Sequence, residues 1–185
     1  MNTVTQFQSH YYNLSNDEIE WIALNKAQTL LPDALQALHE EMHRRGLSQS
    51  IERGIEAQTK QWTKAELTAF IQQYRRTPCP RCGVQGELLN AVRAAVARSF
   101  IVMSSFEPKL VIGCASCISA EVTRLSNLSL LLGWWGIPLG PIYTIRALVI
   151  NSKAAAGAAS AEPTPELCDY VISNIGEIAA DMALH

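Results

Sequence analysis

The residues in this sequence that are best suited to chemistry are two pairs of cysteines. Cys79 with Cys82 and Cys114 with Cys117 both have the spacing Cys-x-x-Cys, and 31 residues lie between the pairs. Thiolates are soft ligands, and each short pair supplies two of them from one turn, so two pairs complete the tetrahedron that zinc prefers. We therefore predict one structural zinc ion per chain, because four protein ligands leave no open position for water or a substrate.

The fifth cysteine and the N-terminus indicate the compartment. Cys168 stands alone on the apolar face of an expected helix, where a thiol belongs to the core. The N-terminal segment lacks the basic and apolar regions of a signal peptide, so we expect none. Metal-bound or free thiols, rather than disulfides, are typical of a cytosolic chain.

A second pattern, His39-Glu40-Glu41-Met42-His43, matches the His-Glu-x-x-His of zinc proteases, in which two histidines bind zinc and the glutamate activates water. A zinc-dependent membrane-associated metalloprotease is therefore an alternative function. The third histidine that such enzymes require is missing downstream. We favour a solvated helix face, with Leu38 and Met42 buried and the two histidines outside, and we assign no catalytic residue.

Charge argues against a polyanion-binding protein. The net charge is -2, and charged residues make up 17% of the chain, below the average for soluble proteins. A nucleic-acid-binding zinc ribbon remains a further alternative and rests on five basic side chains in and near the cysteine region. These are Arg81, Arg93, Arg98, Lys109 and Arg124.

Residues 1–77 are predicted to be helical. Ser15 with Glu18 and Thr63 with Glu66 have the spacing of a capping box, in which each side chain satisfies a free backbone N–H at a helix start. One helix starts after Ser15, and three more are expected over Pro32–Gly46, Ser50–Lys60 and Thr63–Arg76.

The cysteine pairs enclose a stretch with the pattern of short strands, so we predict a zinc ribbon over 78–124. Gly83 lets the backbone curl around the first pair. The β-prone runs are Ala91–Ala97, Phe100–Met103 and Leu110–Ile112, with a break expected at Glu107-Pro108 between the last two.

The third region is apolar: 21 residues from Leu125 to Ile145 carry no charge, and Arg124 and Arg146 flank them. One straight helix of this length would span about 30 Å of hydrocarbon, but glycines and prolines interrupt it. We predict a re-entrant helical hairpin over 125–151, the alternative being a hairpin in a soluble core. The expected membrane-contacting residues are Leu131, Trp134, Trp135, Ile137, Ile142 and Tyr143.

The remaining residues predict a linker and a closing helix. Residues 152–163 are rich in alanine, glycine and serine and are expected to be a linker. A C-terminal amphipathic helix is expected over 164–185, with an apolar stripe of Leu167, Val171, Ile175 and Ile178.

The segment Gly133-Trp134-Trp135-Gly136-Ile137-Pro138-Leu139-Gly140-Pro141-Ile142-Tyr143-Thr144-Ile145 resembles one in uncharacterised bacterial membrane-associated zinc-ribbon proteins, where it often follows a Cys-x-x-Cys pair. The resemblance covers about 79–185. Leu139 departs from the family, which often has tryptophan there. Ala34 to Leu47 is similar to a helix near the start of bacterial membrane-associated proteins. The resemblance implies a location at a membrane and no reaction.

Together these patterns predict an α+β protein and a role without catalysis. We expect a membrane-associated zinc-ribbon adaptor at the cytoplasmic face of the inner membrane, with lipid and an unidentified protein as partners. Nucleic acid is disfavoured by the charge. A partner or a homo-oligomer would satisfy backbone groups freed at the turn of the hairpin.

Overall fold

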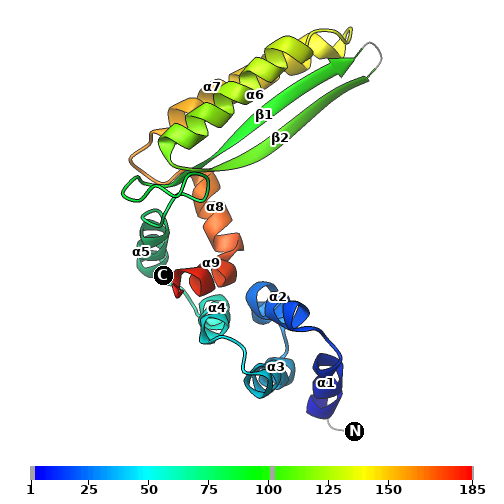
Figure 1. The fold of residues 1–185 in the computed structure, drawn as a ribbon, viewed down its shortest axis with the longest axis vertical. Helices are drawn as coiled ribbons and strands as arrows, with labels where there is room; N and C mark the ends of the chain where they lie inside the picture. The colour runs from blue at the N-terminus through cyan, green and yellow to red at the C-terminus, as the bar shows by residue number, and fades with distance from the viewer. Residues whose placement is uncertain (1–2, 101–102, 185) are drawn as a thin grey trace. The chain divides into compact units, whose positions relative to one another are not determined.

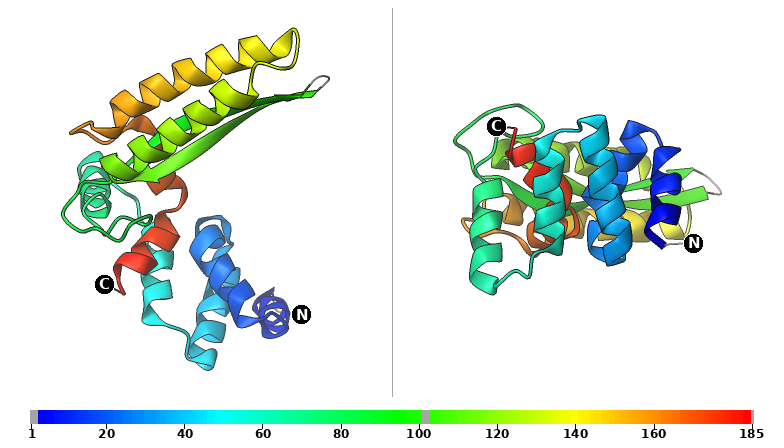
Figure 2. Two further views of the ribbon diagram at one scale, coloured as in Figure 1. Left: turned by 45° about the horizontal axis from the view of Figure 1, so that its top comes forward. Right: turned by 90° about the horizontal axis from the view of Figure 1, so that it is seen from below.

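The computed structural model describes residues 3–100 and 103–184. Helices and one two-stranded antiparallel sheet make up this part of the chain, as predicted for an α+β protein (Figures 1 and 2). The chain divides into two compact units, one formed by Met1–Glu66 with Val171–His185 and the other by Leu67–Tyr170. Ile101 and Val102, which were expected in a strand, lie outside the described residues.

The first unit is helical and is here called the helical unit. It contains α1 (Thr3–Tyr12), α2 (Asn16–Lys26), the 3-10 helix η1 (Ala27–Thr29), α3 (Pro32–Arg45), α4 (Gln49–Thr59) and α9 (Ile175–Met182). α5 (Lys64–Tyr74) and α8 (Pro165–Ser173) each cross a boundary between the two units along the chain.

Local signals set the helix ends as predicted. Ser15 caps α2, since its Oγ accepts from the Glu18 N–H and the Glu18 carboxylate accepts from the Ser15 N–H at 2.8 Å. α3 begins at Pro32 and ends at Gly46, which has a φ of 66°. Thr63 repeats the reciprocal capping at the start of α5.

The core of the helical unit is apolar, and two glycines bring α4 and α9 close together. Buried side chains from α2, α3 and α4, including Ile19, Leu38 and Ile55, pack against one another. A Cβ built on Gly54 would lie 2.7 Å from the carbonyl oxygen of Gly176, and one built on Gly176 would overlap the Leu24 carbonyl oxygen and the Gln58 side chain, so neither position has room for a side chain.

The second unit is here called the hairpin unit. It contains β1 (Asn90–Phe100), β2 (Met103–Gly113), α6 (Ala115–Leu132) and α7 (Leu139–Ala158). The strands pair antiparallel from Asn90 opposite Gly113 to Phe100 opposite Met103. α6 and α7 both run along β1, as Figure 1 shows, and cover its apolar side chains.

The edge of β1 that β2 does not pair is completed by side chains of the helices. Asn151 on α7 accepts a hydrogen bond from the Ala95 N–H at 2.8 Å and donates one to the Ala95 carbonyl at 2.9 Å. Ser129 on α6 accepts from the Ala97 N–H at 3.0 Å. These bonds replace a third strand, because buried backbone groups need partners.

The strand break expected at Glu107-Pro108 is wrong, since β2 continues through it. Pro108 lies opposite Ala95, whose N–H and carbonyl bond to Asn151 rather than to β2. The Ala95–Pro108 pair is therefore a non-hydrogen-bonded pair, in which the proline nitrogen points away from β1. An edge strand tolerates proline at such a position.

Two other expectations need correction. Residues 152–158 belong to α7 rather than to a linker, because an alanine-rich stretch is also a good helix former. The C-terminal helix is divided into α8 and α9 at Asn174. Its apolar stripe is buried as predicted.

The apolar region forms a helical hairpin whose two arms are the end of α6 and the start of α7. Each arm buries one face, with Leu125 and Ala147 fully covered, and exposes the other. Membrane re-entry of this hairpin stays a prediction. Among the described residues, no helix combines the length and apolar character that a membrane crossing requires.

Candidate metal centre

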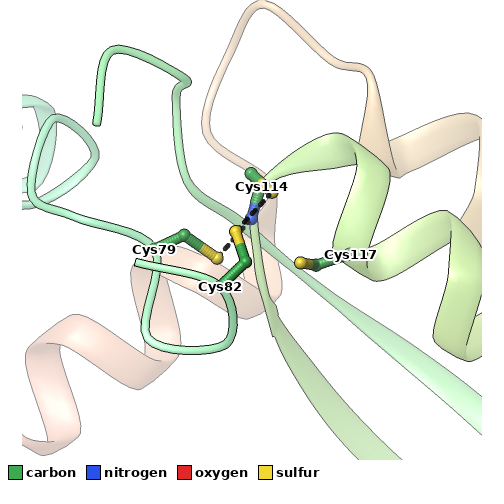
Figure 3. Close-up of side chains that lie close together, drawn as sticks. All are labelled: Cys79, Cys82, Cys114 and Cys117. Atoms are coloured by element: carbon green, nitrogen blue, oxygen red, sulfur yellow. Dashed lines mark hydrogen bonds between the residues drawn. The ribbon is translucent and has the colours of Figure 1, made fainter. Parts of the chain in front are cut away.

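The four predicted cysteine ligands lie together (Figure 3). Their Sγ atoms are all within 4.8 Å of one another, and the Cys82 and Cys114 sulfurs are 3.8 Å apart. Four thiolates around one tetrahedral ion, at metal–sulfur distances of about 2.3 Å, have sulfurs about 3.8 Å apart. The cluster can therefore hold one metal ion with little movement of the chain.

The first pair is presented by a tight turn that follows α5. The Gly83 N–H donates to the Cys79 carbonyl at 2.8 Å, and the Cys79 N–H donates to the Val84 carbonyl at 3.0 Å. Gly83 has a φ of 71°, a conformation that side chains disfavour. This confirms the predicted role of Gly83 in curling the backbone around the pair.

The second pair lies at the junction of β2 and α6, so it differs from the turn expected in a simple ribbon. Cys114 is the N-cap residue of α6, and Cys117 lies in its first turn. The N-terminal end of a helix carries partial positive charge and stabilises thiolates. Ser116 adds a polar contact, with its Oγ 3.1 Å from the Cys114 sulfur.

The thiol pKa values of Cys79 and Cys117 are shifted in opposite directions. Burial raises the pKa of the Cys79 thiol, but N–H groups of Cys114, Arg81 and Cys82 outweigh burial and lower this pKa to about 6. The pKa of Cys117 is raised to about 12, chiefly by its hydrogen bond with Cys82. Closely spaced thiols do not all ionise together unless a cation lies among them, so the cluster favours a bound cation.

The walls of the cluster are mostly apolar, with one arginine. Cys79 and Cys114 are buried and pack against Leu89 and Tyr74. Arg81 lies over Gly113 and donates from Nε to the Ile112 carbonyl at 3.2 Å. Sequence reasoning did not single out Arg81 or Ser116 for these roles; their positions directly after a cysteine and between two cysteines are the signal that identifies them.

The histidine pattern is not gathered into a site. His39, Glu40 and His43 are exposed on α3, whereas Leu38 and Met42 are buried, as predicted for a solvated helix face. The Glu40 carboxylate accepts hydrogen bonds from Gln8 and Gln36 side chains. Within the part of the chain that the structure describes, the four cysteines form the one His, Cys, Asp and Glu cluster suited to a metal.

The basic residues of the nucleic-acid alternative are partly neutralised. Arg81 and Arg124 both lie within ion-pair distance of Glu121, and Arg98 lies 3.5 Å from Glu107. These pairs reduce the charge that the hairpin unit would offer to phosphates.

The expected membrane contacts gather where α6 passes into α7. Five of the six are exposed, with Trp135 at 70% and Ile137 at 86% of their full accessibility. Tyr143 is half-buried, and its ring centroid lies 5.9 Å from that of Phe106. Sequence reasoning missed Phe100 and Met103, which are also exposed, because it placed both in one short strand, whereas Phe100 ends β1 and Met103 begins β2.

Comparisons with known proteins give no relative from which a function could be transferred. No protein-family model, curated protein or solved structure matches the chain. The resemblance of the Gly133–Ile145 segment to bacterial membrane-associated proteins therefore stays a prediction.

Proposed function

We propose that this chain is a zinc-binding, membrane-associated adaptor without catalytic activity, which acts at the cytoplasmic face of a bacterial inner membrane. In this proposal the hairpin unit contacts lipid and the helical unit recruits a protein. The observation that carries the proposal is the uncharged, exposed apolar surface around the connection between α6 and α7.

Zinc is the metal that fits the donor set. Four thiolates and no oxygen ligand favour a soft or borderline ion in tetrahedral geometry. Because all four positions would be filled by protein, the ion would stabilise the fold and leave no place for a substrate. Zinc bound there would join the turn after α5 to the start of α6, at the base of the hairpin unit.

The helical unit offers a surface on which a protein partner can dock. Side chains of α1, α2 and the start of α3 line a hollow of about 440 Å³, with Phe7, Ile22 and Leu31 among them. Leu31 is exposed at this hollow. An apolar segment of a partner would cover these side chains, which is the adaptor role that we propose for this unit.

Cell fractionation tests the membrane part of the proposal. The test variant changes Trp134→Ser, Trp135→Ser and Ile137→Ser together, since these exposed side chains contribute little to the core. Burying such side chains in lipid is favourable by about 1.5–3 kcal/mol each. We therefore expect the wild-type chain in the membrane pellet and the variant at least about tenfold depleted from it.

A matched control changes exposed apolar residues of the helical unit. Tyr12→Ser with Leu184→Ser removes two side chains of similar fractional exposure from the helical unit and should leave the chain in the pellet. A wild-type chain in the supernatant, or equal retention of the triple variant, would contradict membrane association.

A further inference from the structure

Two described parts of the hairpin unit build its apolar end: the end of β1 with the start of β2, and the connection between α6 and α7; they are here called the two tips. Figures 1 and 2 show the end of β1 and the start of β2 beside the connection between α6 and α7. The contact is close, since a Cβ built on Gly136 would lie 3.1 Å from the Cβ of Ser99 and 2.5 Å from the Ser104 Oγ. The two tips therefore form one continuous end of the unit.

The glycines in and next to the connection are buried, and its large apolar residues are exposed. Gly136 and Gly140 are buried against the strands, whereas Trp135 and Ile137 point into solvent. The Trp135 indole N–H donates to the Leu131 carbonyl at 3.0 Å, so the ring carries no unpaired donor into an apolar medium.

Exposure of apolar side chains is greatest at this end. Met103 and Phe100, at the strand ends, are 75% and 65% exposed. Along α7 the exposed apolar residues continue from Ile142 to Val149, and exposure falls to 49% at Val149. The apolar surface is therefore centred on the tips, and the side of α7 only extends it.

The charges around the tips suit an anionic surface. Between Glu121 and Glu162 the sequence has cations at Arg124, Arg146 and Lys153 and no acidic residue. Arg146 lies over the ring of Phe106 at 4.8 Å and belongs to none of the ion pairs found among the described residues.

The distances of the arginines from the tips indicate how deeply the tips can enter a bilayer before the arginines reach the headgroups. Arg146 is seven residues from the start of α7, or about 10 Å at 1.5 Å per residue. Arg98 is two residues from the end of β1, or about 7 Å, but Glu107 lies 3.5 Å from it and offsets its charge, so Arg146 supplies the net positive charge near the tips. Amphipathic elements that bind one leaflet enter it by about 5–10 Å, and arginines suit the headgroup level at that depth.

We infer that the two tips enter an anionic phospholipid bilayer together and end-on, to a shallow depth, with Arg146 and the Arg98–Glu107 ion pair at the level of the headgroups. This inference rests on the proposed membrane association and adds its lipid class, its orientation and the contribution of the β-hairpin. A second copy of the chain is a poorer occupant of this end, because the same cations would face each other.

Binding of the full chain to vesicles of phosphatidylglycerol mixed with phosphatidylcholine tests the inference. Phe100→Ser with Met103→Ser should weaken binding by about tenfold or more, and Arg146→Gln by about fivefold. Val149→Ser and Lys153→Gln are matched controls on the same unit. Lys153 lies about 10 Å along α7 beyond Arg146, a distance of about one screening length from the headgroup level, so both controls should bind within about twofold of wild type. Thermal melts establish that each variant is folded.

The outcomes separate this inference from the proposed function. Tight binding to the anionic vesicles, weak binding to pure phosphatidylcholine and the expected order of variants support end-on insertion. Wild-type binding that Val149→Ser weakens as much as Phe100→Ser with Met103→Ser would show that the hairpin unit lies flat on the vesicle. Equal binding to both vesicle types would show that anionic lipid is not preferred. Either result overturns this inference and leaves the proposed membrane association standing. No binding to any vesicle would overturn membrane association as well. A lipid-free dimer that Phe100→Ser with Met103→Ser abolishes would show that a second copy covers the tips.

Discussion

At the scale of single residues, Asn151 supplies hydrogen bonds to the backbone of β1 along the edge that β2 does not pair. Its carboxamide both accepts from and donates to the backbone of Ala95, as a residue on a third strand would. The side chain also donates to the Ser126 Oγ at 3.1 Å, so its orientation is fixed. A buried amide with all its bonds made stabilises a unique pairing of helix and strand.

Replacing Asn151 should therefore lower the free energy of unfolding by more than the loss of its own hydrogen bonds. Asn151→Leu leaves the N–H and carbonyl of Ala95 buried without partners, so we expect a loss of about 2–4 kcal/mol in the free energy of unfolding. Asn127→Leu, at an exposed position on α6, is the control and should change it little. Urea denaturation measures both; an equal effect of the two variants would show that Asn151 is dispensable.

Glu41 gives the helical unit a dependence on acid. The carboxylate accepts from Arg44 at 2.6 and 2.8 Å and also from Arg45, and these bonds lower its pKa to about 2. A lowered carboxyl pKa contributes stability above the unfolded-state value of 4.5, which is lost as the pH falls toward 2. Arg44 is half exposed, so the expected loss is on the order of 1 kcal/mol.

Melting temperatures between pH 6 and pH 2 test this contribution, in wild type and in Glu41→Gln. The variant should be less stable at neutral pH and should approach wild type at the acid end of the range. Glu52→Gln, an exposed change on α4, is the control and should follow the wild-type curve. If the difference between wild type and Glu41→Gln is the same at every pH, the ionised carboxylate is not the source.

At the scale of elements, the crossing of α4 and α9 depends on two glycines. Gly54→Ala should lower stability by about 1–3 kcal/mol, because its Cβ has no space beside Gly176. Gly157→Ala on α7 is the matched control, since its Cβ would make only ordinary contacts and alanine favours a helix by about 1 kcal/mol. Chemical denaturation should therefore move the two variants in opposite directions; destabilisation by both would mean that space at the crossing is not the cause.

The elements that the sequence predicted well are those that depend on neighbours along the chain. Capping at Ser15 and Thr63 and the left-handed stop at Gly46 involve residues three or four positions apart, so their types and spacing suffice. The cysteine ligands were predictable for a related reason, because a metal requires known donors at known spacings.

Features that depend on register or on distant partners were not predictable in this way. Pro108 suggests a strand break until its partner is known to be Ala95, whose hydrogen bonds go to α7. The meeting of the β-hairpin with the connection between α6 and α7 follows from packing rather than from local pattern. For the same reason Phe100 and Met103 were not expected at the apolar end.

At the scale of the whole molecule, the cysteine cluster and the apolar tips lie at opposite ends of the hairpin unit. The cysteines lie at the end where Asn90 pairs with Gly113, and the apolar tips lie at the end where Phe100 pairs with Met103. Strands of this length span about 33 Å. A metal ion at the base would fix the start of α6 and β2, so the apolar tips depend on the cysteines for their arrangement.

The number of zinc ions per chain, measured by native mass spectrometry on protein purified without added metal, tests this arrangement most directly. We predict one zinc ion per chain, its loss in Cys79→Ser, and its retention in Cys168→Ser, whose thiol lies outside the cluster. Loss of the ion should also destabilise the hairpin unit, since metal binding contributes to folding. A folded chain that carries no metal, or a zinc ion that remains after Cys79→Ser, would contradict the assignment.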